Sequence, residues 1–290
     1  MSPRSSSSLP LRGVCRFIGL VLLFVVLHCA IPSRANAASG DGEVVVIQRT
    51  GAKSYDAAEL YESPRLAEVA LGKDPFYGSV SRTYLAVPMA TLLDASLATQ
   101  RKSIEFRSTD GFVATIPASA LLNADPLKPT AWLAVEPPNA PWPRLPGGAR
   151  GTAGPFALIW SGLGGDKVWS ERWPYQVAEI RVVPAPEERW PSLGLDADAS
   201  AEVQRGRDVF IAQCFVCHQF GGAGTARIGP DLNWPMSPTQ YFLPGALEKY
   251  IRNPASVRDW PERRMEAFPV DRLADEDLKA LISFLGAKAR

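Results

Sequence analysis

Hydrophobic residues show two different patterns along this chain. Between residues 40 and 185 they form short runs rich in β-branched and aromatic residues, bordered by Gly, Pro or Asp, which is typical of strands. The runs are 44–47, 83–87, 103–106, 112–116, 131–135, 156–160 and 175–183. The dipeptide Asp110-Gly111 between the third and fourth runs predicts a tight hairpin turn.

Two further features of this part interrupt the strands. Pro88 suits the first turn of a helix, and Leu92, Leu93 and Leu97 fall on one side of it, so a helix is expected over residues 88–98. Residues 137–154 are rich in Pro and Gly and are expected to form a long surface loop. The expected fold of residues 40–183 is therefore mixed α+β and mostly β.

From residue 199 onward the hydrophobic period becomes helical. Val203, Phe210 and Ile211 share one face, and a second short helix with Leu247, Tyr250 and Ile251 ends at Asn253-Pro254. The last helix places Leu278, Leu281, Ile282 and Leu285 at helical spacing and stops at Gly286. Residues 184–198 form a Pro-rich, charged linker. The pattern predicts two domains, 40–183 and an all-α domain at 199–290.

The N-terminal segment has the features of a targeting signal. Residues 1–40 contain four Arg and no acidic residue, residues 17–31 form a 15-residue apolar run, and Ala35-Asn36-Ala37 follows. A 15-residue helix spans about 22 Å, less than the roughly 30 Å hydrocarbon core of a membrane. We expect residues 1–37 to be a signal peptide that is cleaved after export to the periplasm, with membrane association only if it is retained. A lipoprotein site at Cys29 is the weaker alternative, because the bulky His28 precedes it.

Composition narrows the possible chemistry. Among 290 residues, 46% are hydrophobic and 21% charged, which indicates a globular chain, and the net charge of +1 gives no sign of nucleic-acid binding. The chain has only 4 Cys and 2 His, a composition that argues against a multi-histidine metal site. Signal cleavage would leave Cys214, Cys217 and His218, and would change the charge to about −3, from 27 basic and 30 acidic residues.

These three residues stand in one motif, Cys214-Phe215-Val216-Cys217-His218. The pattern C-x-x-C-H is the attachment site of a c-type haem. Two thiols at this spacing reach two vinyl groups on one porphyrin edge, and the adjacent His binds the iron. The alternative is a redox dithiol followed by a chance His. The sequence predicts one covalently bound haem, with His218 as an iron ligand.

The second axial ligand is not fixed by the residues alone. No other histidine survives the expected cleavage, so the candidates are Met89, Met236, Met265, a lysine or an open position.

Residues 199–290 resemble a class I cytochrome c. The resemblance rests on CFVCH, on IGPDL at residues 228–232, on the segment YIRNPASVRDWPERRMEAFP and on a final amphipathic helix. It implies that Met265 is the distal iron ligand, with Met236 the weaker choice. It also implies that the Pro230 carbonyl orients His218, and that Gly206 and Phe284 form a close helix crossing. One departure is Glu266 after Met265, where the family often has Pro.

Residues 44–183 resemble the molybdopterin-binding domain of sulfite-oxidase-type enzymes. The landmarks are Asp110-Gly111-Phe112, Gly154-Pro155-Phe156 and Trp173. In that family a cysteine thiolate binds molybdenum, but this chain has no cysteine between Ala38 and Gln213, so no catalytic residue is assigned. We expect a docking module for redox partner proteins. A molybdopterin-binding domain with an unusual ligand and an unrelated mixed domain remain as alternatives.

The expected function is single-electron transfer between a donor and an acceptor protein by a periplasmic mono-haem cytochrome, rather than catalysis. The runner-up is a fused oxidoreductase, in which a molybdopterin-type cofactor in the first domain passes substrate electrons to the haem. A haem sensor with a vacant axial site is a third hypothesis. A reduced-minus-oxidised spectrum and the metal content separate the three.

Overall fold

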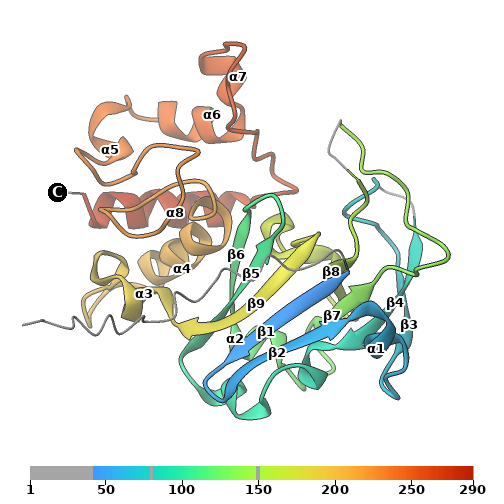
Figure 1. Cartoon of the computed structure of the whole chain (residues 1–290). Helices are drawn as coiled ribbons and strands as arrows, with labels where there is room; N and C mark the ends of the chain where they lie inside the picture. The colour runs from blue at the N-terminus through green and yellow to red at the C-terminus, as the bar shows by residue number, and fades with distance from the viewer. Residues whose placement is uncertain (1–41, 79–80, 148–150, 290) are drawn as a thin grey trace, which may run out of the picture. The chain divides into compact units, whose positions relative to one another are not determined.

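Strands fill the first part of the chain and helices the last part (Figure 1). The computed structural model describes residues 42–78, 81–147 and 151–289, so the predicted signal peptide, 1–37, lies outside the described residues. Below, residues 42–183 are called the β region, 184–198 the connector and 199–289 the helical region.

The β region contains two sheets. The first has the order β2-β1-β9-β5-β6, in which β1 and β9 are parallel and the other neighbours antiparallel. The second has the order β3-β4-β7-β8 and is antiparallel throughout. The strands are β1 (Glu43–Gln48), β2 (Gly51–Asp56), β3 (Ala67–Leu71), β4 (Arg82–Pro88), β5 (Lys102–Ser108), β6 (Val113–Pro117), β7 (Thr130–Val135), β8 (Phe156–Ser161) and β9 (Val177–Pro184). Buried side chains from both sheets, such as Phe106 and Leu158, share one core.

All seven predicted strands are present, and the prediction of a mostly β region is confirmed. The expected hairpin joins β5 to β6, where Gly111 has φ +90° and the Asp110 carboxylate accepts a hydrogen bond from Phe112 N at 2.9 Å. Two strands were not predicted. β2 is mostly exposed and β3 has only two buried side chains, so neither has a continuous apolar run.

The helix predicted over residues 88–98 is wrong. This segment forms two 3₁₀ turns, Met89–Thr91 and Ala95–Thr99, with the apolar side chains buried. Asp94 begins the second turn by accepting a hydrogen bond from Ser96 N. The side-chain amide of Gln48 in β1 donates a hydrogen bond to Leu92 O and accepts one from Asp94 N. In a continuous helix these backbone groups would be free to form hydrogen bonds within the helix. A long-range side chain therefore overrides the local pattern.

The other short elements of the β region are α1 (Ala57–Tyr61), α2 (Ala118–Leu121) and the 3₁₀ turns η3 (Gly165–Lys167) and η4 (Ser170–Arg172). The described residues of the predicted loop, 137–147 and 151–154, contain no helix or strand. The loop is not wholly superficial, however, because Trp142, Leu145 and Ala153 are buried.

The connector is folded and contacts both of its neighbours. It forms α3 (Pro186–Arg189) and a 3₁₀ turn at Pro191–Leu193. Arg189 pairs with Glu105 of β5 at 2.7 Å, and the Trp190 ring lies edge-on to Phe215 with the centroids 5.2 Å apart. Residues 39–290 consequently form one compact unit.

The helical region contains α4 (Ala201–Val209), α5 (Pro238–Tyr241), α6 (Ala246–Arg252), α7 (Pro254–Val257) and α8 (Asp275–Ala287). α4 and α8 cross at Gly206, where an added Cβ would lie 1.9 Å from Ala280 O and 2.8 Å from Phe284 Cβ. The crossing implied by the resemblance is therefore present, and it requires glycine. Within the described ranges, no helix is long and apolar enough to cross a membrane.

Candidate functional site

The C-x-x-C-H motif lies where α4 ends. Ser200 caps the start of α4 by accepting a hydrogen bond from Val203 N, and the helix continues into a π-helical turn at Phe210–Cys214. Cys214 O then accepts hydrogen bonds from Cys217 N at 3.1 Å and His218 N at 2.9 Å. This tight turn brings both thiols and the imidazole together. Both cysteines are half-buried and carry free thiols.

The orientation of His218 is fixed by the segment 229–232. Its Nδ1 lies 2.7 Å from Pro230 O, and because a carbonyl can only accept, the proton is on Nδ1 and the Nε2 lone pair is left for a metal. Gly229 N donates to Cys217 O, and Leu232 N to Gln219 O, both at 2.9 Å. The contact with Pro230 that the resemblance implied is thus present.

Two glycines and an aspartate hold this arrangement. A Cβ on Gly229 would lie 2.4 Å from His218 Cε1, so only glycine leaves room for the ring. A Cβ on Gly224, which has φ +89°, would lie 2.6 Å from the Phe215 ring. The Asp231 carboxylate accepts from Gly221 N, Gly222 N and Asn233 N at 2.6 to 2.8 Å. The loop that follows the motif is therefore closely fitted to the histidine.

The direction of the pKa shifts of Cys214, Cys217 and His218 fits a haem site better than a redox-active dithiol. Burial raises the pKa of both Cys214 and Cys217, with a further increase from the negative charge of Glu171. A reactive C-x-x-C pair needs the opposite shift, a lowered thiol pKa. Burial lowers the pKa of His218 and favours the neutral imidazole, which is the form that binds a metal.

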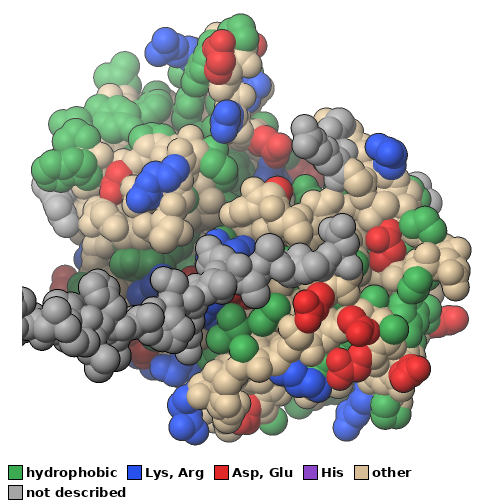
Figure 2. Space-filling view, viewed as in Figure 1, with side chains coloured by type: hydrophobic (Ala, Val, Ile, Leu, Met, Phe, Trp, Pro, Cys, Tyr) green, Lys and Arg blue, Asp and Glu red, His purple; other side chains and the backbone are tan. Residues whose placement is uncertain are grey.

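Polar and apolar groups around the motif lack partners. Gln213 Oε1, Gln213 Nε2 and Asn233 Oδ1 are buried without a hydrogen bond. Large apolar side chains are exposed before and at α5, and Figure 2 shows hydrophobic side chains gathered over this element at the upper left. These are Trp234, Met236, Tyr241 and Leu243. Free thiols, a neutral histidine and apolar surroundings with buried polar atoms together fit a covalently bound haem.

The three methionines considered as distal ligands occupy different environments. Met89 is fully buried in the core of the β region, so it is not available to an iron beside His218. Met236 follows the cis Trp234-Pro235 bond and is 45% exposed. Met265 is half-buried and packs against the core of the helical region. This placement favours Met265.

The landmarks of the β region are structural. Asp110 caps the β-turn, the Gly154-Pro155 bond is cis, and Trp173 Nε1 donates to Val168 O at 3.1 Å. Among the described residues, no group of three or more His, Cys, Asp or Glu side chains is placed to hold a metal ion.

Sequence reasoning missed two charged residues that lie beside the motif. Glu171 in η4 is buried and pairs with Arg272, which belongs to the loop between Met265 and α8. Their charges act on Cys214 and Cys217 in opposite directions. No local pattern identifies a pair 101 residues apart, although a lone Glu between apolar strands is a weak signal.

The comparison with protein families agrees with this geometry. The model of the cytochrome c family matches residues 203–287, from α4 to the end of α8. The helical region is therefore similar to a cytochrome c domain, and this match supports a haem-containing electron carrier and haem c as a cofactor. A search of curated proteins returned no match to this chain. Neither comparison supports the resemblance of residues 44–183 to a molybdopterin-binding domain.

Proposed function

We propose that this protein is a periplasmic mono-haem c-type cytochrome that passes single electrons between a donor and an acceptor protein. Cys214 and Cys217 would attach one haem covalently, and His218 and Met265 would bind its iron. The observation that carries the proposal is the hydrogen bond from His218 Nδ1 to Pro230 O, next to two free thiols at C-x-x-C-H spacing. The match to the cytochrome c family supports it.

The haem supplies a one-electron couple, and the chain's residues orient it and set its environment. Pro230 holds the His218 ring in one tautomer, so that Nε2 is the ligating atom. Phe210, Phe220 and Phe284 pack together behind the motif and keep this side of the site dry, with 5.0 Å between the Phe220 and Phe284 centroids. A methionine ligand opposite a histidine raises the reduction potential. If His218 and Met265 both bound the iron, no coordination position would be left for a substrate.

A spectrum of the purified full-length protein tests this proposal. We expect a haem that survives denaturing electrophoresis, one iron per chain, and a ferric Met–iron charge-transfer band. Met265→Ala removes the band, whereas the control Met236→Ala keeps it, because Met236 is exposed. A band that survives in Met265→Ala and disappears in Met236→Ala would assign the ligand to Met236.

The β region is proposed to dock redox partners. Its two sheets share one buried core, which gives a rigid framework on which a partner could bind. The alternative, a fused oxidoreductase with a molybdopterin-type cofactor, makes a different prediction. Metal analysis of the purified protein separates them: iron without molybdenum supports the carrier, and molybdenum near one per chain supports the enzyme.

Export of the mature chain completes the proposal. Cell fractionation, with N-terminal sequencing of the recovered protein, is expected to find a periplasmic chain that begins near Ala38. A mature protein that still begins at Met1 would contradict the signal peptide prediction.

A further inference from the structure

We propose that the β region helps to hold the distal iron ligand, with Glu171 acting through Arg272 as a positioning residue for Met265. The inference rests on the proposed function, in which Met265 binds the iron. Glu171 lies in η4, between β8 and β9, outside the segment that matches the cytochrome c family. The distal side of the haem site would then be built from both regions of the chain.

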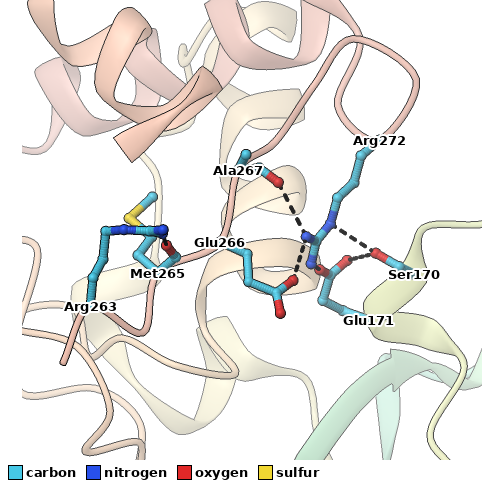
Figure 3. Close-up of polar contacts among 7 residues, drawn as sticks. All are labelled: Ser170, Glu171, Arg263, Met265, Glu266, Ala267 and Arg272. Atoms are coloured by element: carbon cyan, nitrogen blue, oxygen red, sulfur yellow. Dashed lines mark hydrogen bonds and ion pairs between the residues drawn. The ribbon is translucent and has the colours of Figure 1, made fainter. Parts of the chain in front are cut away.

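Arg272 lies at the centre of the contacts shown in Figure 3. Its Nη2 pairs with Glu171 Oε1 at 2.5 Å, and its Nε donates to Ser170 Oγ at 3.1 Å. Its Nη1 donates to Glu266 Oε2 at 2.9 Å and to Ala267 O at 3.2 Å. Arg272 thus ties two residues directly after Met265 to the turn η4 of the β region.

Because Glu171 is buried, its pairing with Arg272 favours one position of Arg272. Its side chain is 6% exposed, and Ser170 Oγ donates to its second carboxylate oxygen at 2.9 Å. A buried carboxylate is costly unless it is paired and hydrogen-bonded, so Glu171 strongly favours the one arrangement that brings Arg272 to it. Arg272 is 26% exposed, and its guanidinium lies 4.4 Å from the centroid of the Phe268 ring. This geometry restricts the loop after Met265.

Other arginines brace the loop from within the helical region. Arg263 Nη1 donates to Met265 O at 2.5 Å (Figure 3). Its Nε pairs with Asp259 at 3.0 Å. Arg252 Nη1 donates to Phe268 O at 2.9 Å and also to Leu273 O. Among these three arginines, Arg272 is the one that bonds to the β region. The loop is therefore held from both sides of Met265.

The pair also lies close to the haem-attachment motif. η4 packs against Phe210–Cys214, the π-helical turn that carries the first cysteine. A thioether is a neutral ligand, and its occupancy depends on how well the protein holds it in place. Residues that restrict the loop consequently affect ligation as well as stability.

The experiment uses the full-length holoprotein with Glu171→Gln, Arg272→Gln and the double variant. Each single change is expected to weaken Met ligation roughly tenfold, the middle of the range for coupled neighbours. The readouts are the ferric charge-transfer band, carbon monoxide binding to the reduced protein, and the reduction potential. The double variant is expected to be no worse than Arg272→Gln alone, because that change already removes the contact with Glu171. Arg272→Lys, which keeps the charge, is expected to restore part of the band.

The sign of the potential shift separates positioning from simple charge. If the pair acted by charge alone, loss of Glu171 would raise the potential and loss of Arg272 would lower it, because a negative charge favours ferric iron. If it positions Met265, both variants lower the potential, since loss of methionine favours the ferric state. Opposite shifts with an intact band would overturn the inference.

Two controls keep the test decisive. Asp277→Asn breaks the pair between Arg205 in α4 and Asp277 in α8. This pair matches the tested one, because its atoms are 2.5 Å apart and its carboxylate side chain is 7% exposed. It does not contact the loop after Met265, so the variant should keep the charge-transfer band. If Glu171→Gln does not fold, Ser170→Ala removes hydrogen bonds to both partners more gently and should weaken the band in the same direction. A band that Met265→Ala removes but Glu171→Gln and Ser170→Ala preserve overturns this inference alone. Absence of the band in the wild-type protein overturns the proposed function itself.

Discussion

Buried polar side chains find hydrogen-bond partners more completely in the β region than in the helical region. Asp74 in the β region is 1% exposed and accepts hydrogen bonds from Phe76 N, Tyr77 N, Arg82 Nε and Tyr84 OH. In the helical region, Gln213 and Asn233 bury three polar atoms without partners. One other buried atom among the described residues, Arg172 Nε, is also unpaired, and it lies in η4.

The exposed apolar side chains follow the same division. Of the ten large hydrophobic side chains exposed in the described structure, eight belong to the helical region. Two sheets with a shared core bury their own apolar faces, whereas fewer than a hundred residues in short helices bury a smaller share of theirs. The β region thus buries its own apolar side chains, whereas the helical region leaves more apolar side chains exposed and more buried polar side-chain atoms unpaired, as the proposed haem would require.

The largest expected effect is unfolding of the helical region while the β region stays folded. In Cys214→Ser/Cys217→Ser the chain loses covalent haem, and we expect loss of helical structure, seen by far-ultraviolet circular dichroism, together with proteolytic cutting after residue 199. The β region should remain as a protease-resistant fragment, because its core is closed. Covalent haem in the double variant, or loss of the β fragment with it, would contradict this division.

The next effect is confined to the β region. Asp74→Asn leaves Arg82 without its carboxylate, and breaking a buried pair costs about 3–5 kcal/mol. Denaturant unfolding followed by tryptophan fluorescence should show this loss, while the haem spectrum stays unchanged. Asp110→Asn is the control, since it sits in an exposed turn and an amide oxygen also accepts from Phe112 N, so its cost should stay within about 0.5 kcal/mol. A changed haem spectrum in Asp74→Asn would show that the two regions are more tightly coupled than proposed.

A smaller effect tests the crossing of α4 and α8. Gly206→Ala places a Cβ against Ala280 O and should destabilise the helical region by about 1–3 kcal/mol through overpacking. The matched control is Gly286→Ala in α8, where a Cβ meets nothing within 4 Å and a gain of up to about 1 kcal/mol is expected. Thermal melts monitored at the haem Soret band measure both. If Gly206→Ala and Gly286→Ala melted at the same temperature, the two helices would separate enough to accept the added Cβ without loss of stability.

The smallest expected effect concerns alkaline pH. Burial raises the pKa of Tyr61 to about 12, and it also raises the pKa of Tyr77, Tyr84 and Tyr175 in the β region. In the unfolded chain a tyrosine titrates near pH 10, so the unfolded state loses these protons first. The stabilisation is complete below about pH 10 and is lost as the pH rises toward 12.

Melts of the β region at pH 9 and pH 11, with tyrosinate absorbance recorded in parallel, check this prediction. In the helical region, Tyr241 is the one described tyrosine with a raised pKa; partial desolvation is the cause, and since its side chain is 53% exposed the effect on stability should be small. The melting temperature of the β region should therefore fall more steeply with pH. A steeper fall in the helical region would reverse the comparison.

Where the chemistry is local, the sequence determined it. The spacing of Cys214, Cys217 and His218 predicts a haem-attachment site within one turn, and Asp110-Gly111 predicts the hairpin that joins β5 to β6, because these features depend on residues next to one another in the chain. Strands with a continuous apolar run were predicted for the same reason. The periodicity of the last helix was long enough to predict both its existence and its end near Gly286.

Tertiary structure decided what depends on distant residues. β2 is a strand because β1 pairs with it, and residues 88–98 are not a helix because Gln48 binds their backbone. The parallel pairing of β1 with β9, and the pair between Glu171 and Arg272, join residues more than a hundred positions apart. Such contacts carry no local pattern, since burial in the folded chain creates their strength. The motif could be predicted from the sequence, whereas the surroundings that set its properties are visible only in the fold.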